Sequence, residues 1–292
     1  MATDVEVVLD AHAELGEGAI WHAQRQVLYW VDILKQQVHV FNPKTRRNRT
    51  IQLAEPVGTV VPRKAGGVMV AAKHGFAHLD LNTEMLAFYA DPEPDKPANR
   101  FNDGKCDPAG RFWAGTMPMS GSEPTGSLYC LFPDRTVKKM LSPVTVSNGI
   151  AWSLDARTMY FIDTPRRVVD AFDYDFATAN ISNRRDAIVV PPELGWPDGC
   201  TIDAEGMLWI AHYGGGCVTR WNPQTGALLA KLPVPATNVT SVAFGGATLD
   251  VLYITTARAG LSPLAIRQNP HEGALFATRP GVTGIEAFEF AG

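Results

Sequence analysis

Two carboxylate and two amide side chains recur along this sequence with a spacing that would suit a shared cation site. They belong to a series whose members lie 42 to 50 residues apart: Glu17, Thr59, Asn102, Asn148, Asp198 and Thr240. Carboxylate and amide oxygens favour hard cations such as Ca²⁺, Mg²⁺ or Mn²⁺, and Zn²⁺ and Fe²⁺ also accept them. Two carboxylates in a narrow space repel each other unless a cation lies between them. If the fold gathers this series, the sequence predicts one divalent-metal site with open positions for water and substrate.

The segments that carry these residues have the pattern of β-hairpins. Two copies match in spacing at four positions, which are Asn102, Asp107, Gly110 and Trp113 in one and Asp198, Asp203, Gly206 and Trp209 in the other. Each copy contains a short strand, an Asp/Gly turn and a second strand with an aromatic residue. Asp and Gly suit the turn because Asp bonds its own backbone and Gly tolerates positive φ. Looser copies begin near residues 17, 59, 148 and 240, and the register of the copy near 59 is the least defined.

Six units of this length are typical of propeller blades. The pattern therefore predicts an all-β, six-bladed β-propeller that spans residues 1–292 as one domain, with the metal in its central channel. A pair of packed β-sheets is the alternative, which the regular period disfavours. We expect the N-terminal DVEVVLD and the C-terminal GIEAFEFAG to pair in one blade and close the ring. The only helical segment is SPLAIRQNP, with one or two turns at most.

Each candidate residue also has a structural interpretation. Asn148-Gly149 and Asp198-Gly199 are common turn dipeptides, and Glu17 taken alone could be a solvated loop carboxylate. Their recurrence at one repeat position favours the functional interpretation. Three histidines in separate repeats leave a His-rich metal site open, although packed or hydrogen-bonded histidines are more common: His22, His74 and His212. The recurrent tryptophans indicate packing between blades: Trp21, Trp113, Trp152 and Trp209.

The composition excludes several classes of protein. Of the 292 residues, 46% are hydrophobic and 19% are charged, which is ordinary for a globular protein and excludes a disordered one. The net charge of −4 and the lack of a basic stripe argue against nucleic-acid and membrane partners. The N-terminus lacks the features of a signal peptide, and no apolar run could span a bilayer. The four cysteines form no CxxC pair, so we expect a soluble, cytoplasmic protein without disulfides, as a monomer or weak oligomer.

Several longer motifs resemble one known family. They run in order from about residue 15 to 285 and include LGEGAIW, RFNDGKCDPAGRFWAGTM, SNGIAWSLD, PDGCTIDAEGMLWIAHYGGG and LYITTARAG. Together they are similar to the regucalcin (senescence marker protein)/gluconolactonase family. The resemblance implies a six-bladed propeller, one divalent metal and hydrolysis of sugar lactones.

The resemblance also assigns roles to particular residues. The metal ligands of the family correspond to Glu17, Asn148 and Asp198, and its substrate-contacting Arg and Asn correspond to Arg100 and Asn102. A third substrate-binding position is occupied by Ser120, where relatives of the regucalcin type carry a Glu. Glu123 lies three residues further on and is a candidate to replace it.

The expected reaction is hydrolysis of an aldonolactone, with Asp198 as the general base and Arg100 and Asn102 orienting the sugar. A bound cation would polarise the lactone carbonyl. The sequence contains no GxSxG motif, so a serine hydrolase is disfavoured. A calcium-binding regulator without enzyme activity is the main alternative. A protein-interaction propeller is a third, although it would have no need for carboxylates in its channel.

Overall fold

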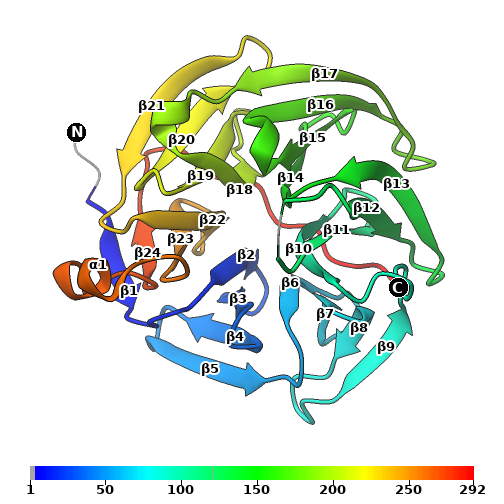
Figure 1. Cartoon of the computed structure of the whole chain (residues 1–292), viewed down its shortest axis with the longest axis horizontal. Coiled ribbons are helices and arrows are strands. Elements are labelled where there is room, and N and C mark those ends of the chain that lie inside the picture. The colour runs from blue at the N-terminus through cyan, green and yellow to red at the C-terminus, as the bar shows by residue number, and fades with distance from the viewer. Residues whose placement is uncertain (1–3, 121) are drawn as a thin grey trace.

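Six four-stranded antiparallel sheets surround a central axis in the computed structural model (Figure 1). The structure describes residues 4–120 and 122–292. The predicted six-bladed β-propeller is therefore confirmed. Each repeat start that the sequence indicated lies in the innermost strand of a different blade.

The strands of each blade are given from the channel outward. Blade 1 contains β2 (Gly16–His22), β3 (Val27–Asp32), β4 (Gln37–Asn42) and β5 (Arg47–Gln52). Blade 2 contains β6 (Val57–Pro62), β7 (Val68–Ala72), β8 (Gly75–Leu79) and β9 (Leu86–Ala90). Blade 3 contains β10 (Asn99–Cys106), β11 (Phe112–Pro118), β12 (Gly126–Leu131) and β13 (Val137–Val144). Blade 4 contains β14 (Ser147–Trp152), β15 (Thr158–Asp163), β16 (Val168–Tyr174) and β17 (Ile181–Val189). Blade 5 contains β18 (Trp196–Ile202), β19 (Leu208–Tyr213), β20 (Cys217–Asn222) and β21 (Ala227–Pro233). Blade 6 contains β22 (Asn238–Gly245), β23 (Val251–Ala257), β24 (Leu275–Thr278) and β1 (Glu6–Leu9).

Helical structure is confined to short connections. The helix α1 (Pro263–Gln268) has six residues and lies within the segment for which one or two turns were predicted. Of the two 3₁₀ turns in the described residues, η1 (Thr164–Arg166) lies between β15 and β16 of blade 4, and η2 (Pro192–Leu194) lies just before β18, the inner strand of blade 5. Among residues 4–120 and 122–292, no helix has the length and apolar character needed to cross a membrane. All four cysteines belong to the described residues, and they are buried and unpaired.

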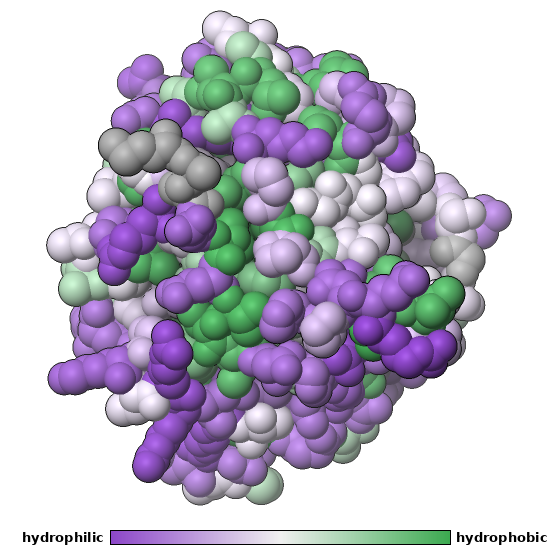
Figure 2. Space-filling model, turned by 90° about the vertical axis from the view of Figure 1, so that its left-hand side faces the viewer, coloured by the Kyte–Doolittle hydropathy of each residue, from purple (hydrophilic) through white to green (hydrophobic). Residues whose placement is uncertain are grey.

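The ring closes differently from the prediction at its C-terminal side. The N-terminal strand β1 does complete a blade, but its partner is β24 rather than the segment GIEAFEFAG. Pairing with residues 284–292 was therefore wrong. Figure 2 views the molecule from the side of β1 and β24, where hydrophilic side chains surround several small groups of hydrophobic ones. β1 protects the outer edge of β24, which would otherwise present unpaired backbone groups.

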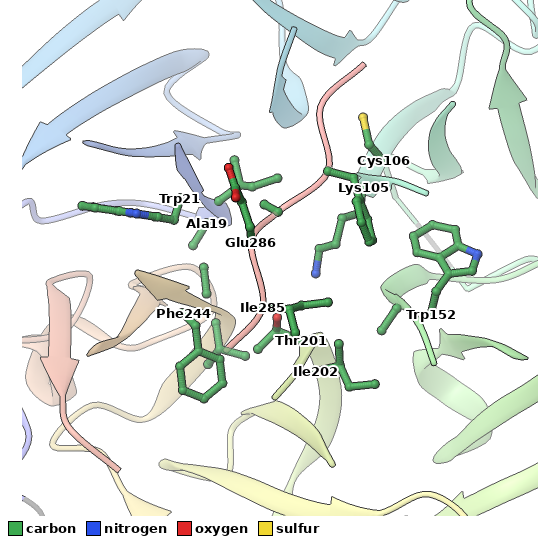
Figure 3. Close-up of a pocket in the computed structure, with 16 residues that line it drawn as sticks. Ala19, Trp21, Lys105, Cys106, Trp152, Thr201, Ile202, Phe244, Ile285 and Glu286 are labelled. Atoms are coloured by element: carbon green, nitrogen blue, oxygen red, sulfur yellow. The ribbon is translucent and has the colours of Figure 1, made fainter. Parts of the chain in front are cut away.

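The last residues form an extended segment, residues 279–292, which we call the C-terminal strap. It crosses the ring from the blade 5–6 side to the blade 2–3 side (Figure 1). Its backbone bonds Ala204 and Leu249 at one end and Pro62 at the other. Residues 285–288 of the strap cover a cavity of about 50 Å³, which is lined by the C-terminal halves of inner strands (Figure 3). The strap thus closes one end of the channel.

Aromatic side chains fill the spaces between blades, as the sequence predicted. The Trp113 and Trp152 rings from blades 3 and 4 meet edge to face with centroids 5.9 Å apart. Trp21 of blade 1 stacks on Tyr253 of blade 6, at 5.6 Å. Each of these tryptophans is at most 3% exposed. Because aromatic pairs add to the free energy of simple burial, these contacts hold neighbouring blades together.

The Asp of the repeated hairpin does more than shape a turn. Asp107 accepts hydrogen bonds from the Arg111 backbone N–H (2.9 Å), the Arg111 Nε (2.6 Å) and the Trp113 indole (2.8 Å). In the equivalent hairpin of blade 5, Asp203 accepts from the Trp209 indole at 2.9 Å. The identical spacing in the sequence therefore reflects an Asp–Trp hydrogen bond that ties each turn to the core.

Replacing Asp107 by Ala is expected to lower the free energy of unfolding by about 3–5 kcal/mol, since the buried Arg111 would lose its counter-charge. Urea unfolding followed by tryptophan fluorescence measures this change. Asp134→Ala is the control, because the side-chain bonds of Asp134 within the described residues go to Thr136 in an exposed turn of the same blade. A loss of less than about 1 kcal/mol in Asp107→Ala would contradict the assignment.

Candidate metal centre

Every inner strand is irregular at the residue that begins its repeat. The pairing register with the second strand shifts beside each of these positions: Glu17, Thr59, Asn102, Asn148, Asp198 and Thr240. Such bulges re-aim side chains and are frequent next to active sites. Six bulges at equivalent places explain why residues from different blades meet at one end of the channel.

Glycines beside these bulges let the inner strands approach each other closely. A Cβ atom on Gly149 would lie 2.8 Å from the Asp198 carbonyl oxygen. A Cβ on Gly199 would lie 2.8 Å from the Thr240 carbonyl oxygen. Both glycines are within strands, so the interpretation of these dipeptides as ordinary turns is wrong. They are small because the backbones of neighbouring blades nearly touch there.

The amide side chains of Asn102 and Asn148 are in direct contact. Asn102 Nδ2 donates to Asn148 Oδ1 (3.0 Å) and to the Ser147 carbonyl (2.8 Å). Asn102 Oδ1 in turn accepts from Arg100 Nη1 at 2.7 Å. These side chains come from blades 3 and 4, and the two amides are 5% and 4% exposed. The structure therefore brings together Asn102 and Asn148, which the repeat grouped, and Arg100, which only the resemblance to the family indicated.

The carboxyl groups of Glu17 and Asp198 form the acidic part of the cluster. Burial, and then the charge of Asp103, raise the pKa of Glu17 to about 8. Burial, followed by the charges of Glu17 and Asp103, raises the pKa of Asp198 well above its usual value. Both shifts mean that these carboxyl groups resist ionisation without a compensating cation.

Asp103 is a member of this cluster that the sequence did not single out. It is 6% exposed, and burial raises its pKa while Lys105 and the Gly104 N–H lower it. Its only signal in the sequence is its place after Asn102, within the same bulge. Arg100 balances part of the negative charge; burial lowers its pKa to about 10, and the charges of Glu17 and Asp198 raise it.

The chemistry of these groups fits a divalent cation. Asp198 Oδ1 is buried and has no hydrogen-bond partner among the described residues, which is costly for a carboxylate oxygen. Within residues 4–120 and 122–292, no three His, Cys, Asp or Glu side chains are arranged to hold a metal. A cation here would therefore need the Asn148 amide oxygen as well as Glu17 and Asp198. An oxygen-only set of this kind suits hard cations.

The two threonines of the series serve the backbone instead. Thr59 Oγ1 donates to the Gly104 carbonyl at 3.0 Å, and Thr240 Oγ1 donates to the Gly16 carbonyl. Each bond joins the inner strands of adjacent blades. These two threonines thus join neighbouring inner strands at the level of the cluster. The side chains that could bind a metal or a substrate are the other four members of the series.

Buried aspartates at the end of the second strand fix the approach to two of the candidate ligands. Asp32 accepts from the backbone of Glu14 (2.8 Å) and Leu15 (3.1 Å), just before Glu17. Asp163 accepts from the backbone of Thr145 and Val146 (2.8 Å to Val146), just before Asn148. The same arrangement in blades 1 and 4 therefore positions the Glu17 carboxylate and the Asn148 amide.

Ser120 and Glu123 are not part of the hydrogen-bonded cluster. Ser120 is exposed in the connection between β11 and β12, and Glu123 is exposed in the same connection. This connection is tied to the start of β10, because Met119 N–H donates to the Ala98 carbonyl at 2.9 Å. It therefore lies beside Arg100, at the end of the channel opposite the strap.

The three histidines do not form a site together. His22 lies 3.8 Å from Glu289 of the strap, His74 pairs with Glu55, and His212 bonds Thr219 inside blade 5. Each is therefore hydrogen-bonded or paired within its own region, as the structural interpretation of the sequence expected.

The fold and the cluster define a class of protein: a six-bladed propeller with buried carboxylates and amides gathered at one end of its channel. Residues 15–258 match the region described as SMP-30/Gluconolactonase/LRE-like. The chain belongs to this family.

Named relatives support the assignment over the full length. Regucalcin from Oryctolagus cuniculus is 41% identical over 294 residues, which cover 99% of this chain and 98% of the relative. A luciferin-regenerating enzyme has a similar solved structure, with a TM-score of 0.92, 33% identity and 99% of both chains covered. A calcium-binding regucalcin from Agrobacterium tumefaciens gives a TM-score of 0.94 at 28% identity, covering 99% of this chain and 97% of that one.

Proposed function

We propose that this protein is a divalent-metal-dependent lactonase that hydrolyses sugar-acid lactones to the free acids. The observation that carries the proposal is the pair of buried carboxyl groups, Glu17 and Asp198, together with the buried Asn148 amide. Family membership supports the same reaction class, since gluconolactonase is part of the family description.

In this proposal Glu17, Asn148 and Asp198 would hold the metal. When bound, a divalent cation supplies positive charge that polarises the ester carbonyl and stabilises the oxyanion. The role of Asp198 is to accept a proton from the attacking water at the carboxylate oxygen that does not hold the metal. Asp198 is then available to return that proton to the alkoxide leaving group when the ring opens.

Arg100 and Asn102 orient the substrate. Within the described residues only Nη1 of Arg100 is bonded, to Asn102 and to the Phe101 carbonyl, so Nε and Nη2 remain for a ligand. Guanidinium donors suit the hydroxyl and ester oxygens of a sugar lactone. Because the strap covers the other end of the channel, substrate reaches the cluster from the Arg100 side. Fixing the ring there lowers the entropic part of the barrier.

A second candidate is a calcium-binding protein without catalysis. It is favoured by the names of the relatives, since the Agrobacterium tumefaciens structure is described as a calcium-binding protein. This role requires tight Ca²⁺ binding and no turnover of lactones. It uses the same residues, so the two candidates differ in the outcome of one experiment.

That experiment measures hydrolysis of a panel of aldonolactones by proton release, before and after chelation and after adding back Ca²⁺, Zn²⁺, Mn²⁺ or Mg²⁺. The proposal expects turnover that chelation abolishes and at least one cation restores. Metal binding by calorimetry without turnover of any lactone would instead support the calcium-binding candidate. Turnover that survives complete removal of metal would contradict both.

The rim of the site predicts a broad substrate range. A Ser at position 120 in place of an acidic residue removes one acceptor for sugar hydroxyls, and a lost hydrogen bond costs about 0.5–1.5 kcal/mol. Lactones that differ at one hydroxyl should then differ by no more than roughly tenfold in kcat/KM. Ser120→Glu is expected to sharpen this preference.

Glu123→Ala tests the alternative that Glu123 supplies the missing carboxylate. The open rim predicts that this variant keeps the parent's profile across five- and six-carbon aldonolactones. If the parent is strictly specific and Glu123→Ala loses that specificity, Glu123 performs the role instead.

A further inference from the structure

A chain of hydrogen bonds runs through the candidate metal centre and crosses three blades. It starts at Arg100 Nη1, which donates to Asn102 Oδ1 at 2.7 Å, and continues from Asn102 Nδ2 to Asn148 Oδ1 at 3.0 Å. Asn148 Nδ2 then donates to Thr164 Oγ1 at 2.8 Å. Thr164 Oγ1 finally donates to the Pro197 carbonyl at 2.8 Å. The chain ends on the residue next to Asp198.

The two ends of this chain fix its direction. A guanidinium only donates, so the group of Asn102 that faces Arg100 must be its oxygen. A backbone carbonyl only accepts, so the single hydroxyl hydrogen of Thr164 must point at Pro197. Thr164 therefore offers only a lone pair to Asn148, and the amide of Asn148 must turn its NH₂ group toward Thr164.

This direction decides which atom of Asn148 faces Asn102 and the interior of the cluster. With NH₂ held by Thr164, the amide oxygen is directed toward Asn102 and the centre of the cluster. If the amide were reversed, its NH₂ group would face the centre and repel a cation. An amide binds a hard cation only through oxygen.

We infer that Thr164 is a positioning residue that keeps the Asn148 amide oxygen available to the metal and couples the blade 4 ligand to the blade 5 strand that carries Asp198. The inference rests on the metal site of the proposed function and assigns a role outside its ligand set. Thr164 suits this role because it opens the turn η1 directly after Asp163, whose carboxylate holds the backbone before Asn148. One turn thus controls both the position and the orientation of Asn148.

Thr164→Val keeps the shape of the side chain and removes both hydrogen bonds, whereas Thr164→Ser keeps both. Removing a hydrogen-bond partner of a ligand typically weakens metal binding about 10–100-fold. Calorimetric titration of the metal-free proteins with Mn²⁺ and Ca²⁺ should show this loss in Thr164→Val and parent-like affinity, within about threefold, in Thr164→Ser. Thr158→Val is the matched control, since Thr158 is also half-buried and lies at the other end of β15.

A second measurement separates this inference from the proposed function. Selective ¹⁵N labelling of asparagine reports the side-chain amide of Asn148 in the metal-free protein. The parent and Thr164→Ser should protect this NH₂ group from exchange with water, and Thr164→Val should not. Parent-like affinity and parent-like protection in Thr164→Val would overturn the inference. If the parent binds no divalent cation while the loss of protection is still seen, the metal-dependent function fails and the orienting role of Thr164 stands.

Discussion

Asp198→Asn is expected to reduce kcat/KM for lactone hydrolysis by about a thousandfold or more, which corresponds to roughly 4 kcal/mol of transition-state stabilisation. The substitution keeps the size and shape of the side chain but removes a charge and the atom that accepts a proton. Metal affinity should fall as well, because only one of the two carboxylates remains in the proposed ligand set. Steady-state kinetics with saturating metal, together with calorimetric titration, measure the two effects separately.

The same variant should make the metal-free protein more stable at alkaline pH. The raised pKa of Asp198 means that its ionised form is poorly tolerated in the buried cluster, and an amide avoids that cost. Asp134→Asn provides a control on an exposed turn and should leave activity and metal affinity unchanged. If Asp198→Asn bound metal and hydrolysed lactones like the parent, Asp198 would be neither ligand nor base.

Removal of the metal is expected to destabilise the protein more at pH 9 than at pH 7. Glu17 has a pKa of about 8 in the folded protein, compared with an ordinary value of 4.5. Between these values the folded chain holds a proton that the unfolded chain has already lost. The stability of the metal-free protein therefore falls as pH rises toward 8, by up to about 1.4 kcal/mol per pH unit for this group, and levels off above it.

A bound cation should reverse this trend, because it favours the ionised carboxylates and binds only the folded chain. The rise in Tm on adding metal should thus be larger at pH 9 than at pH 7. Thermal unfolding across this range, with and without chelator, tests the prediction. Glu17→Gln is the internal control, since it removes one titrating group and should make the pH dependence of the metal-free protein shallower than in the parent. A metal-free parent that gains stability from pH 7 to 9 would contradict the charge arrangement described.

The pH window lies outside the range in which the exposed carboxylates and the histidines titrate. The four buried thiols, whose pKa values burial raises, also contribute to it, so the comparison with Glu17→Gln is what isolates Glu17. Exposed aspartates such as Asp134 and Asp173 have lowered pKa values, so their contribution to stability is lost only in acid. Burial lowers the pKa of His39 and His212 to about 4, so these rings stay neutral throughout the window. The unfolded chain loses its histidine protons near pH 6.5, which is below the range used.

The repeat in the sequence determined the number of blades, the identity of the inner strands and four polar members of the cluster. This was possible because a ring of equivalent units places equivalent positions around one axis. The spacing of Asp107 and Trp113 likewise reflected a hydrogen bond between them, because within one hairpin the separation along the sequence determines how far apart two residues lie. The position of Arg100 came only from the resemblance to the family.

Only the tertiary structure decided how the ring closes and which groups share the cluster. β24 rather than the C-terminal segment pairs with β1, because the strap is held across the channel by backbone bonds to other blades. Asp103 and Thr164 are neighbours of the cluster only through bulges and turns of different blades, and no local pattern records such long-range packing. The pKa of Asp103 depends on burial, and the hydrogen-bond direction at Thr164 depends on a partner from another blade. Both conditions exist only once the blades have packed around the axis.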